Sequence, residues 1–134
     1  VDKYIVDKAG CSISRIFAEH GEEYFRALET EALNEIYNTV TGTVISTGGG
    51  LPMRKVNRDI LKRLGEVVYL DVSPDCVYER LKDDTTRPLL QSENPMERIE
   101  ELLGFRRPVY LDGADRTVNV SYRTVEDIIK DIID

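Results

Sequence analysis

The chain has 134 residues, 41% hydrophobic, 32% charged and 7% aromatic, which is typical of one globular domain and excludes a disordered segment. Its 25 Asp and Glu residues outnumber its 18 Lys and Arg residues, and the formal net charge of −7 argues against binding to nucleic acid or to an anionic membrane. The chain has two cysteines and no CxxC motif, which predicts a reducing, cytoplasmic location with neither a disulfide nor a zinc site. It has no apolar run of about 18 residues, so we expect no membrane span.

The hydrophobic pattern predicts alternating helices and strands. The expected helices cover residues 12–20, 22–37, 56–64, 74–81, 97–103 and 124–133, and the expected strands cover residues 44–47, 67–72 and 117–120. The strand at 67–72 is apolar at consecutive positions, which is typical of a strand covered on both faces. We therefore expect an α/β fold with three layers, in which helices cover both faces of an open parallel sheet.

A run of three glycines follows the first expected strand directly. In open α/β sheets ligands bind at the carboxyl ends of the strands, and glycines there let backbone N–H groups approach a ligand closely. The alternative for so short a motif is a flexible turn. The position after a strand favours a binding site at Gly48, Gly49 and Gly50.

Arginines in three places are candidates for binding an anion. Arg26 and Glu29 share one face of an expected helix, where Glu29 either orients a partly buried Arg26 or forms an ordinary surface ion pair. Arg87 lies in a polar stretch between two helices, and either closes over a phosphate or belongs to a plain turn. Arg106 opens the sequence Arg-Arg-Pro-Val-Tyr.

In this order and spacing, the motifs resemble the shikimate kinase family, within the nucleoside monophosphate kinase group of P-loop proteins, over essentially the whole chain. The matching segments are Asp2-Lys3-Tyr4-Ile5 (the end of an Asp-x-Asp segment), Phe25-Arg26 with Glu29, Ser46-Thr47-Gly48-Gly49-Gly50, Arg87-Pro88-Leu89-Leu90 (a lid) and Arg106-x-Pro108-x-Tyr110. The resemblance implies an enzyme that uses ATP and Mg²⁺ to phosphorylate the 3-hydroxyl of shikimate in aromatic amino acid biosynthesis. It also implies one domain over residues 1–134, with a lid at about 82–96, that is a monomer when complete.

For the shikimate site, the resemblance implies that Arg26 and Arg106 pair with the carboxylate and that Glu29 orients Arg26. Asp2 would accept hydrogen bonds from shikimate hydroxyls and act as the base for the hydroxyl that attacks ATP. The backbone N–H groups of the glycine run would bind ring hydroxyls.

For the nucleotide side, the resemblance implies that Arg87 stabilises the transferring phosphoryl group. Arg123, in the loop at 121–124, and Arg80 or Lys82 would flank adenine. Ser46 would reach a magnesium-bound water, while no residue of the chain would ligate the metal directly. These residue types fit phosphoryl transfer, which depends on positioning and charge neutralisation.

The chain departs from the family in one motif, because GxxxxGKS or GxxxxGKT occurs nowhere in its 134 residues. The phosphate loop and the first two strands of the family would precede Asp2, so we expect an N-terminally incomplete domain that is inactive alone. Two other functions remain open: a shikimate-kinase-like binding or regulatory module that has lost catalysis, and a related small-molecule kinase such as a gluconate kinase.

Overall fold

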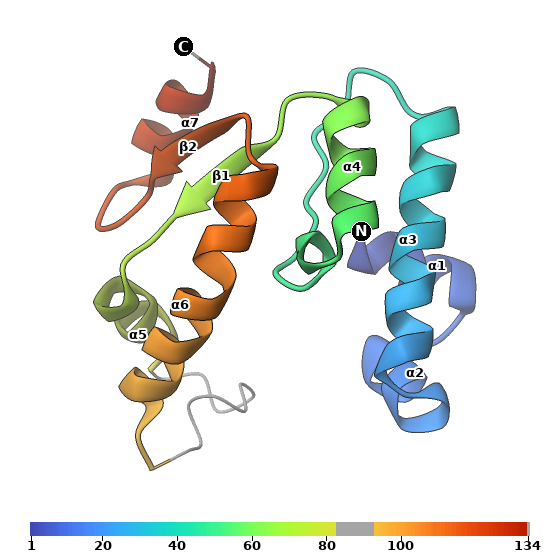
Figure 1. Ribbon diagram of the computed structural model, residues 1–134, viewed down its shortest axis with the longest axis horizontal. Coiled ribbons are helices and arrows are strands. Elements are labelled where there is room, and N and C mark those ends of the chain that lie inside the picture. Colours follow the sequence, from blue (N-terminus) through green and yellow to red (C-terminus); the bar gives the residue numbers. More distant parts are fainter. Residues whose placement is uncertain (83–92, 134) are drawn as a thin grey trace. The chain divides into compact units, whose positions relative to one another are not determined.

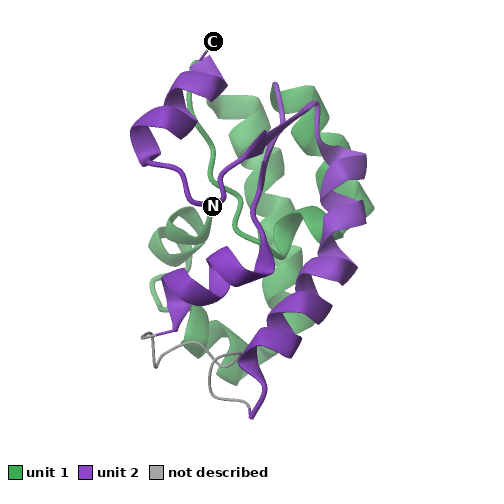
Figure 2. Ribbon diagram, turned by 90° about the vertical axis from the view of Figure 1, so that its left-hand side faces the viewer, with its two compact units in different colours: residues 1–65 green, residues 66–134 purple. Residues whose placement is uncertain are grey.

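The computed structural model describes residues 1–82 and 93–133. Residues 1–65 and residues 66–134 form two compact units, coloured separately in Figure 2. Among the described residues, none of the helices combines the length and the apolar character needed to span a bilayer. That residues 1–134 form a single domain stays a prediction.

The first unit contains α1 (Asp2–Ala9), α2 (Ile13–His20), α3 (Glu22–Thr39), the 3-10 helix η1 (Leu51–Met53) and α4 (Lys55–Leu64), as Figure 1 shows. The buried side chains of Ile5, Ile16, Phe25 and Ala32 pack together and join α1, α2 and α3. A second set of buried residues, Leu33, Leu51 and Ile60 among them, lies on α3, η1 and α4. The helices predicted at 12–20, 22–37 and 56–64 are confirmed as α2, α3 and α4.

Helix α1 was not predicted, because its eight residues carry no clear apolar period. Ile5 is its only buried residue. Two features outside that pattern hold it: Gly10 ends the helix in the left-handed region, at φ 74°, and Tyr4 and Lys8 both donate to the carboxylate of Glu35 on α3. Short helices of this kind depend on packing more than on intrinsic propensity.

The strand predicted at 44–47 is wrong. The segment belongs to no sheet in the described part of the chain, and Val44 is 97% exposed. A β-branched run predicts extended backbone, but a strand also needs a neighbour whose backbone groups pair with its own. Here the carbonyl of Ser46 accepts a hydrogen bond from the nitrogen of Val1 at 2.7 Å, which tethers the segment to the start of α1.

The second unit contains β1 (Val68–Asp71), α5 (Pro74–Leu81), α6 (Pro95–Gly113), β2 (Arg116–Asn119) and α7 (Val125–Ile133). β1 and β2 pair in parallel, with Val68 opposite Arg116 and Asp71 opposite Asn119. This confirms the strands predicted at 67–72 and 117–120 and their parallel pairing. The hydroxyl of Ser73 caps α5 by accepting from the N–H of Cys76 at 3.4 Å.

Helix α6 is much longer than the helix predicted at 97–103. It continues through Gly104 and Pro108, residues that normally weaken or end a helix. Contacts within the second unit hold both halves: Ile99 is buried in the first half, and in the second half the ring of Tyr110 lies 5.2 Å from that of Tyr69. Tertiary packing therefore overrides the local helix-breaking signal.

Candidate functional site

The charge pair predicted on α3 is present and largely enclosed. Arg26 Nη1 donates to Glu29 Oε1 at 2.7 Å, and Arg26 Nη2 lies 3.6 Å from Glu22 Oε1. The side chain of Glu29 is 3% exposed and that of Arg26 is 22% exposed. Glu29 therefore acts as a buried partner that holds the guanidinium in one place, while the Arg26 side chain remains partly exposed.

Burial raises the pKa of Glu29 above its usual range, and the hydrogen bond and charge of Arg26 offset only part of that rise. Burial alone would lower the pKa of Arg26, but the hydrogen bonds and charges of Glu29 and Glu22 together outweigh it and raise that pKa. The charges of Asp2 and Arg54 act on Glu29 too, the first raising its pKa and the second lowering it. Asp2 and Arg54 thus belong to the electrostatic surroundings of the pair.

The glycine run meets Arg26 at Gly50. A methyl group built on Gly50 would lie 2.5 Å from Nη1 and 2.6 Å from Nη2 of Arg26, so any side chain here would displace the Arg26 guanidinium. Gly48 needs glycine for a different reason, because its φ of 76° lies in the left-handed region. The structure therefore brings together two motifs that the sequence analysis predicted separately, the glycine run and the Arg26–Glu29 pair.

Asp2 and Ser46 also belong to this unit. Asp2 is exposed in the first turn of α1, where a carboxylate favours the helix N-terminus. Ser46 is exposed just before the glycine run, and its carbonyl accepts from the nitrogen of Val1. The residues in the first unit that were predicted to bind or orient shikimate are thus Asp2, Arg26, Glu29, Gly48, Gly49 and Gly50.

Sequence analysis missed Thr30, Arg54 and Asn57, which connect α3 to the glycine run. The Thr30 hydroxyl donates to Asn57 Oδ1 at 2.8 Å, and Asn57 Nδ2 donates to the carbonyl of Leu51 at 2.9 Å. Arg54 Nη1 donates to Thr30 Oγ1 at 3.4 Å. The available signal was a polar residue, Asn57, on the apolar face that Ile60 and Leu61 mark on α4.

In the second unit, two adjacent arginines of α6 have different surroundings. Arg107 makes a two-pronged contact with Asp71 at the end of β1, through Nε at 3.3 Å and Nη2 at 3.1 Å. This contact holds the pKa of Asp71 below its usual range. Arg106 is half-buried and has no acidic partner within residues 1–82 and 93–133. Of the two, Arg106 is the one whose charge remains available to an anion.

The arginines predicted to flank adenine both bond within the second unit. Arg80 Nη2 donates to the carbonyl of Val120 at 2.9 Å. Arg123 Nη1 donates to the carbonyl of Asn119 at 2.8 Å and lies 2.7 Å from Asp131 Oδ2. These bonds use one Nη group of Arg80 and both Nη groups of Arg123. Lys82, the other candidate for this role, lies 2.9 Å from Glu79.

Arg87 and most of the predicted lid lie outside the residues that the structure describes. In the described part of the chain, no group of three or more His, Cys, Asp or Glu residues is placed to hold a metal ion.

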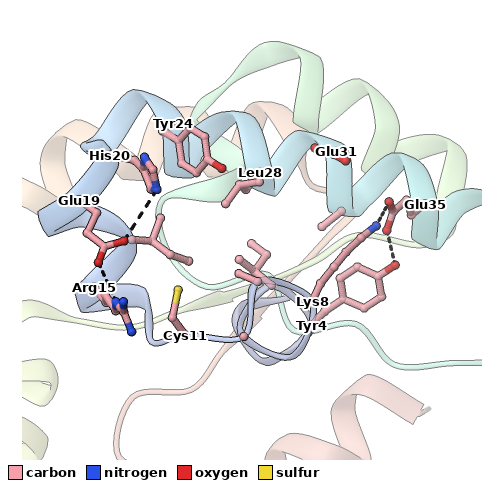
Figure 3. A pocket seen from close by; sticks show the side chains of 15 residues that line it. Tyr4, Lys8, Cys11, Arg15, Glu19, His20, Tyr24, Leu28, Glu31 and Glu35 are labelled. Atoms are coloured by element: carbon pink, nitrogen blue, oxygen red, sulfur yellow. Dashed lines mark hydrogen bonds and ion pairs between the residues drawn. The ribbon is translucent and has the colours of Figure 1, made fainter.

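A pocket of about 450 Å³ lies among α1, α2 and α3 (Figure 3). At 3.6 residues per turn, its α3 residues Leu28 and Glu35 lie opposite the helix face that carries Arg26 and Glu29. On its rim the ring of His20 stacks on that of Tyr24, with centroids 4.3 Å apart. No residue predicted to bind substrate or nucleotide lines this pocket, so it is separate from the predicted site.

Comparison with known proteins identifies the family. A model of the shikimate kinase family matches residues 1–134. The shikimate kinase of Geobacter sulfurreducens is 41% identical over 132 residues, which cover 98% of this chain and 72% of that protein. That of a Sulfurihydrogenibium species is 41% identical over 133 residues, covering 99% of this chain and 78% of that protein.

Solved structures agree. The shikimate kinase of Acinetobacter baumannii, solved in complex with shikimate, matches with a TM-score of 0.86 and 37% identity, over 98% of this chain and 73% of that one. The enzyme of Bacteroides thetaiotaomicron matches with a TM-score of 0.81 and 32% identity, over 98% and 77%. The predicted fold, an α/β fold of the P-loop kinase type, is confirmed. The chain belongs to the shikimate kinase family.

Proposed function

We propose that this chain binds shikimate and takes part in the ATP-dependent phosphorylation of its 3-hydroxyl group. The observation that carries the proposal is the environment of Arg26. Its guanidinium is neutralised by buried Glu29 and lies against Gly50, and the Arg26 side chain as a whole is 22% exposed. A guanidinium fixed in this way beside backbone donors suits a small, carboxylated polyol.

In the proposed site, Arg26 and Arg106 pair with the carboxylate of shikimate. The backbone N–H groups of Gly48, Gly49 and Gly50 bind its ring hydroxyls, and Asp2 accepts a proton from the hydroxyl that attacks ATP. The complex of the Acinetobacter relative with shikimate supports the choice of ligand. The open charge of Arg106, beside a neighbour already paired with Asp71, supports its assignment.

ATP is the proposed co-substrate. Arg87 would stabilise the transferring phosphoryl group, and the faces of the Arg80 and Arg123 guanidiniums would lie beside adenine, since their edges bond elsewhere. Mg²⁺ would accompany the phosphates and neutralise their charge, as is usual for an ion that keeps several water ligands. Ser46, exposed before the glycine run, would bind one of those waters.

Catalysis also needs a loop that holds the ATP phosphates, and no GxxxxGKS or GxxxxGKT occurs within the 134 residues. We therefore expect residues 1–134 alone to release no ADP in a coupled assay with ATP and shikimate. ADP release by this polypeptide would overturn that expectation.

The direct test of the proposed function is calorimetric titration of shikimate into the full-length gene product, with gluconate as the comparison ligand. We expect shikimate to bind and gluconate to bind at least tenfold more weakly, a difference of about 1.4 kcal/mol. Tighter binding of gluconate would assign the chain to another small-molecule kinase. Shikimate binding without ADP release from the full-length product would indicate a binding module instead.

A further inference from the structure

We propose that Thr30 and Asn57 form a bridge that holds the glycine run in register with Arg26, and that this bridge sets the affinity of the substrate site without touching the ligand. The inference rests on the proposed function for the identity of that ligand. The bridge runs from α3, through Thr30 and Asn57, to the carbonyl of Leu51, the residue that follows Gly50.

Asn57 is the central member. The residue is fully buried, and both ends of its amide are used: Oδ1 accepts from the Thr30 hydroxyl and Nδ2 donates to the Leu51 carbonyl. A buried amide is costly unless its hydrogen bonds are made. An apolar side chain of similar size would fill the same place beside Ile60 and Leu61, but it would leave that carbonyl without this donor. The need to bond the Leu51 carbonyl therefore explains why a polar residue, Asn57, occupies this buried position.

The glycine run has little freedom to shift. Arg26 lies so close to Gly50 that a single methyl group would not fit between them. Arg26 is itself restrained, because the Nη1 atom that lies nearest Gly50 also donates to Glu29 at 2.7 Å. A displacement of the loop by a few tenths of an ångström would therefore change the spacing between the guanidinium and the backbone donors that a ligand would contact together.

The bridge also reaches the surface. The Thr30 hydroxyl donates to Asn57 and accepts from Arg54 Nη1, and Arg54 is exposed. Thr30 lies one helical turn after Arg26. One hydroxyl on α3 thus connects the glycine run, the helix that carries Arg26 and an exposed cation, which is the arrangement expected of a positioning residue.

The test replaces Thr30 by valine, which keeps the shape and removes the hydroxyl. The Thr30 hydroxyl lies 3.3 Å from the carbonyl of Arg26, one turn back on α3, in addition to its contact with Asn57. Thr39→Val is the matched control, because the exposed Thr39 hydroxyl bonds the carbonyl of Glu35, one turn back on the same helix, at 2.8 Å. We measure the dissociation constant of shikimate and the KM values for shikimate and ATP in the full-length gene product. We expect Thr30→Val to weaken shikimate binding by about tenfold and to leave the KM for ATP unchanged. Thr30→Ser should restore binding, and Thr39→Val should have no effect.

Amide hydrogen exchange of residues 48–53 provides a readout that needs no ligand. Thr30→Val should speed exchange in this segment but not in α1 or α2, and Asn57→Ala should do so more strongly if it folds. Equal exchange and equal shikimate affinity in wild type and Thr30→Val would overturn the bridge. If wild type binds no shikimate, the proposed function is wrong. The bridge can then still be tested by exchange alone. Faster exchange of this segment in Thr30→Val than in wild type would support the bridge, and unchanged exchange would refute it.

Discussion

Glu29 holds Arg26 from a position that water scarcely reaches, with 2.7 Å between Oε1 and Nη1 and 3% of the Glu29 side chain exposed. From the i, i+3 spacing on α3 alone, the ion pair would be expected to stabilise the helix by only a few tenths of a kcal/mol. Burial makes the pair more important, because a buried carboxylate that loses its partner here keeps a desolvation cost of about 1–3 kcal/mol.

The first prediction concerns Arg26→Ala. Loss of the guanidinium leaves Glu29 buried without its main partner, so we expect the free energy of unfolding to fall by about 1–3 kcal/mol. Shikimate affinity should fall about a hundredfold, as expected for a lost charge-assisted bond. Urea denaturation and calorimetry measure the two effects. Arg15→Ala is the control, since Arg15 forms an exposed pair with Glu19 and should change neither.

The second prediction concerns pH and Glu29→Gln. Because burial raises the pKa of Glu29 above 4.5, the folded chain binds more protons than the unfolded chain just above that pH. The contribution of Glu29 to stability is then fully present below pH 4.5 and is lost as the pH rises through the folded pKa. As the pH rises from 4.5 through the folded pKa of Glu29, the stability of Glu29→Gln relative to wild type should therefore rise. A difference that stays constant with pH would show that this pKa is not raised.

The third prediction separates the glycines. In Gly50→Ala the new methyl group displaces the Arg26 guanidinium, which weakens its bond to Glu29, so shikimate affinity should fall by at least about tenfold. Gly48→Ala has open space around it but a φ of 76°, so it should lower stability by about 1 kcal/mol through strain. Gly65→Ala, with open space and extended backbone, should change neither quantity. Equal losses of affinity for all three variants would contradict the close contact at Gly50.

The sequence predicts this site in part because its residues carry local signals. Arg26 and Glu29 share a helix face, and three consecutive glycines are rare enough to stand out. Thr30 and Asn57 carry no such signal, since nothing along the chain indicates that residues 27 positions apart share a hydrogen bond. Their contribution exists only once α3 and α4 lie side by side.

The errors in the fold have the same origin. The run at 44–47 has strand-forming residues but no partner strand among the described residues, whereas the run at 67–72 has one in β2. Likewise, Gly104 and Pro108 suggest the end of a helix, yet contacts of the later turns with β1 keep α6 intact. Local pattern predicts backbone preference, and long-range contacts decide where it is overridden.

The last prediction compares the adjacent arginines of α6. Arg107 is paired with Asp71, while Arg106 has no acidic partner in the described part of the chain. We expect Arg106→Ala to weaken shikimate binding by about a hundredfold, as for a lost charge-assisted bond, with the midpoint of thermal unfolding almost unchanged. Arg107→Ala should leave direct contacts with shikimate intact and lower stability only slightly, because the Arg107 side chain is exposed and water screens its pair with Asp71.

The pH dependence of the Arg107 variant offers an internal check. Arg107 lowers the pKa of Asp71 below 3.8, so the pair contributes stability above pH 3.8 that is lost as the pH falls through the folded pKa. The stability difference between wild type and Arg107→Ala should therefore shrink on acidification, whereas the difference for Arg106→Ala should stay near zero. If instead Arg107→Ala abolishes shikimate binding while Arg106→Ala preserves it, the assignment of the two arginines must be exchanged, because the ligand would then compete with Asp71 for Arg107.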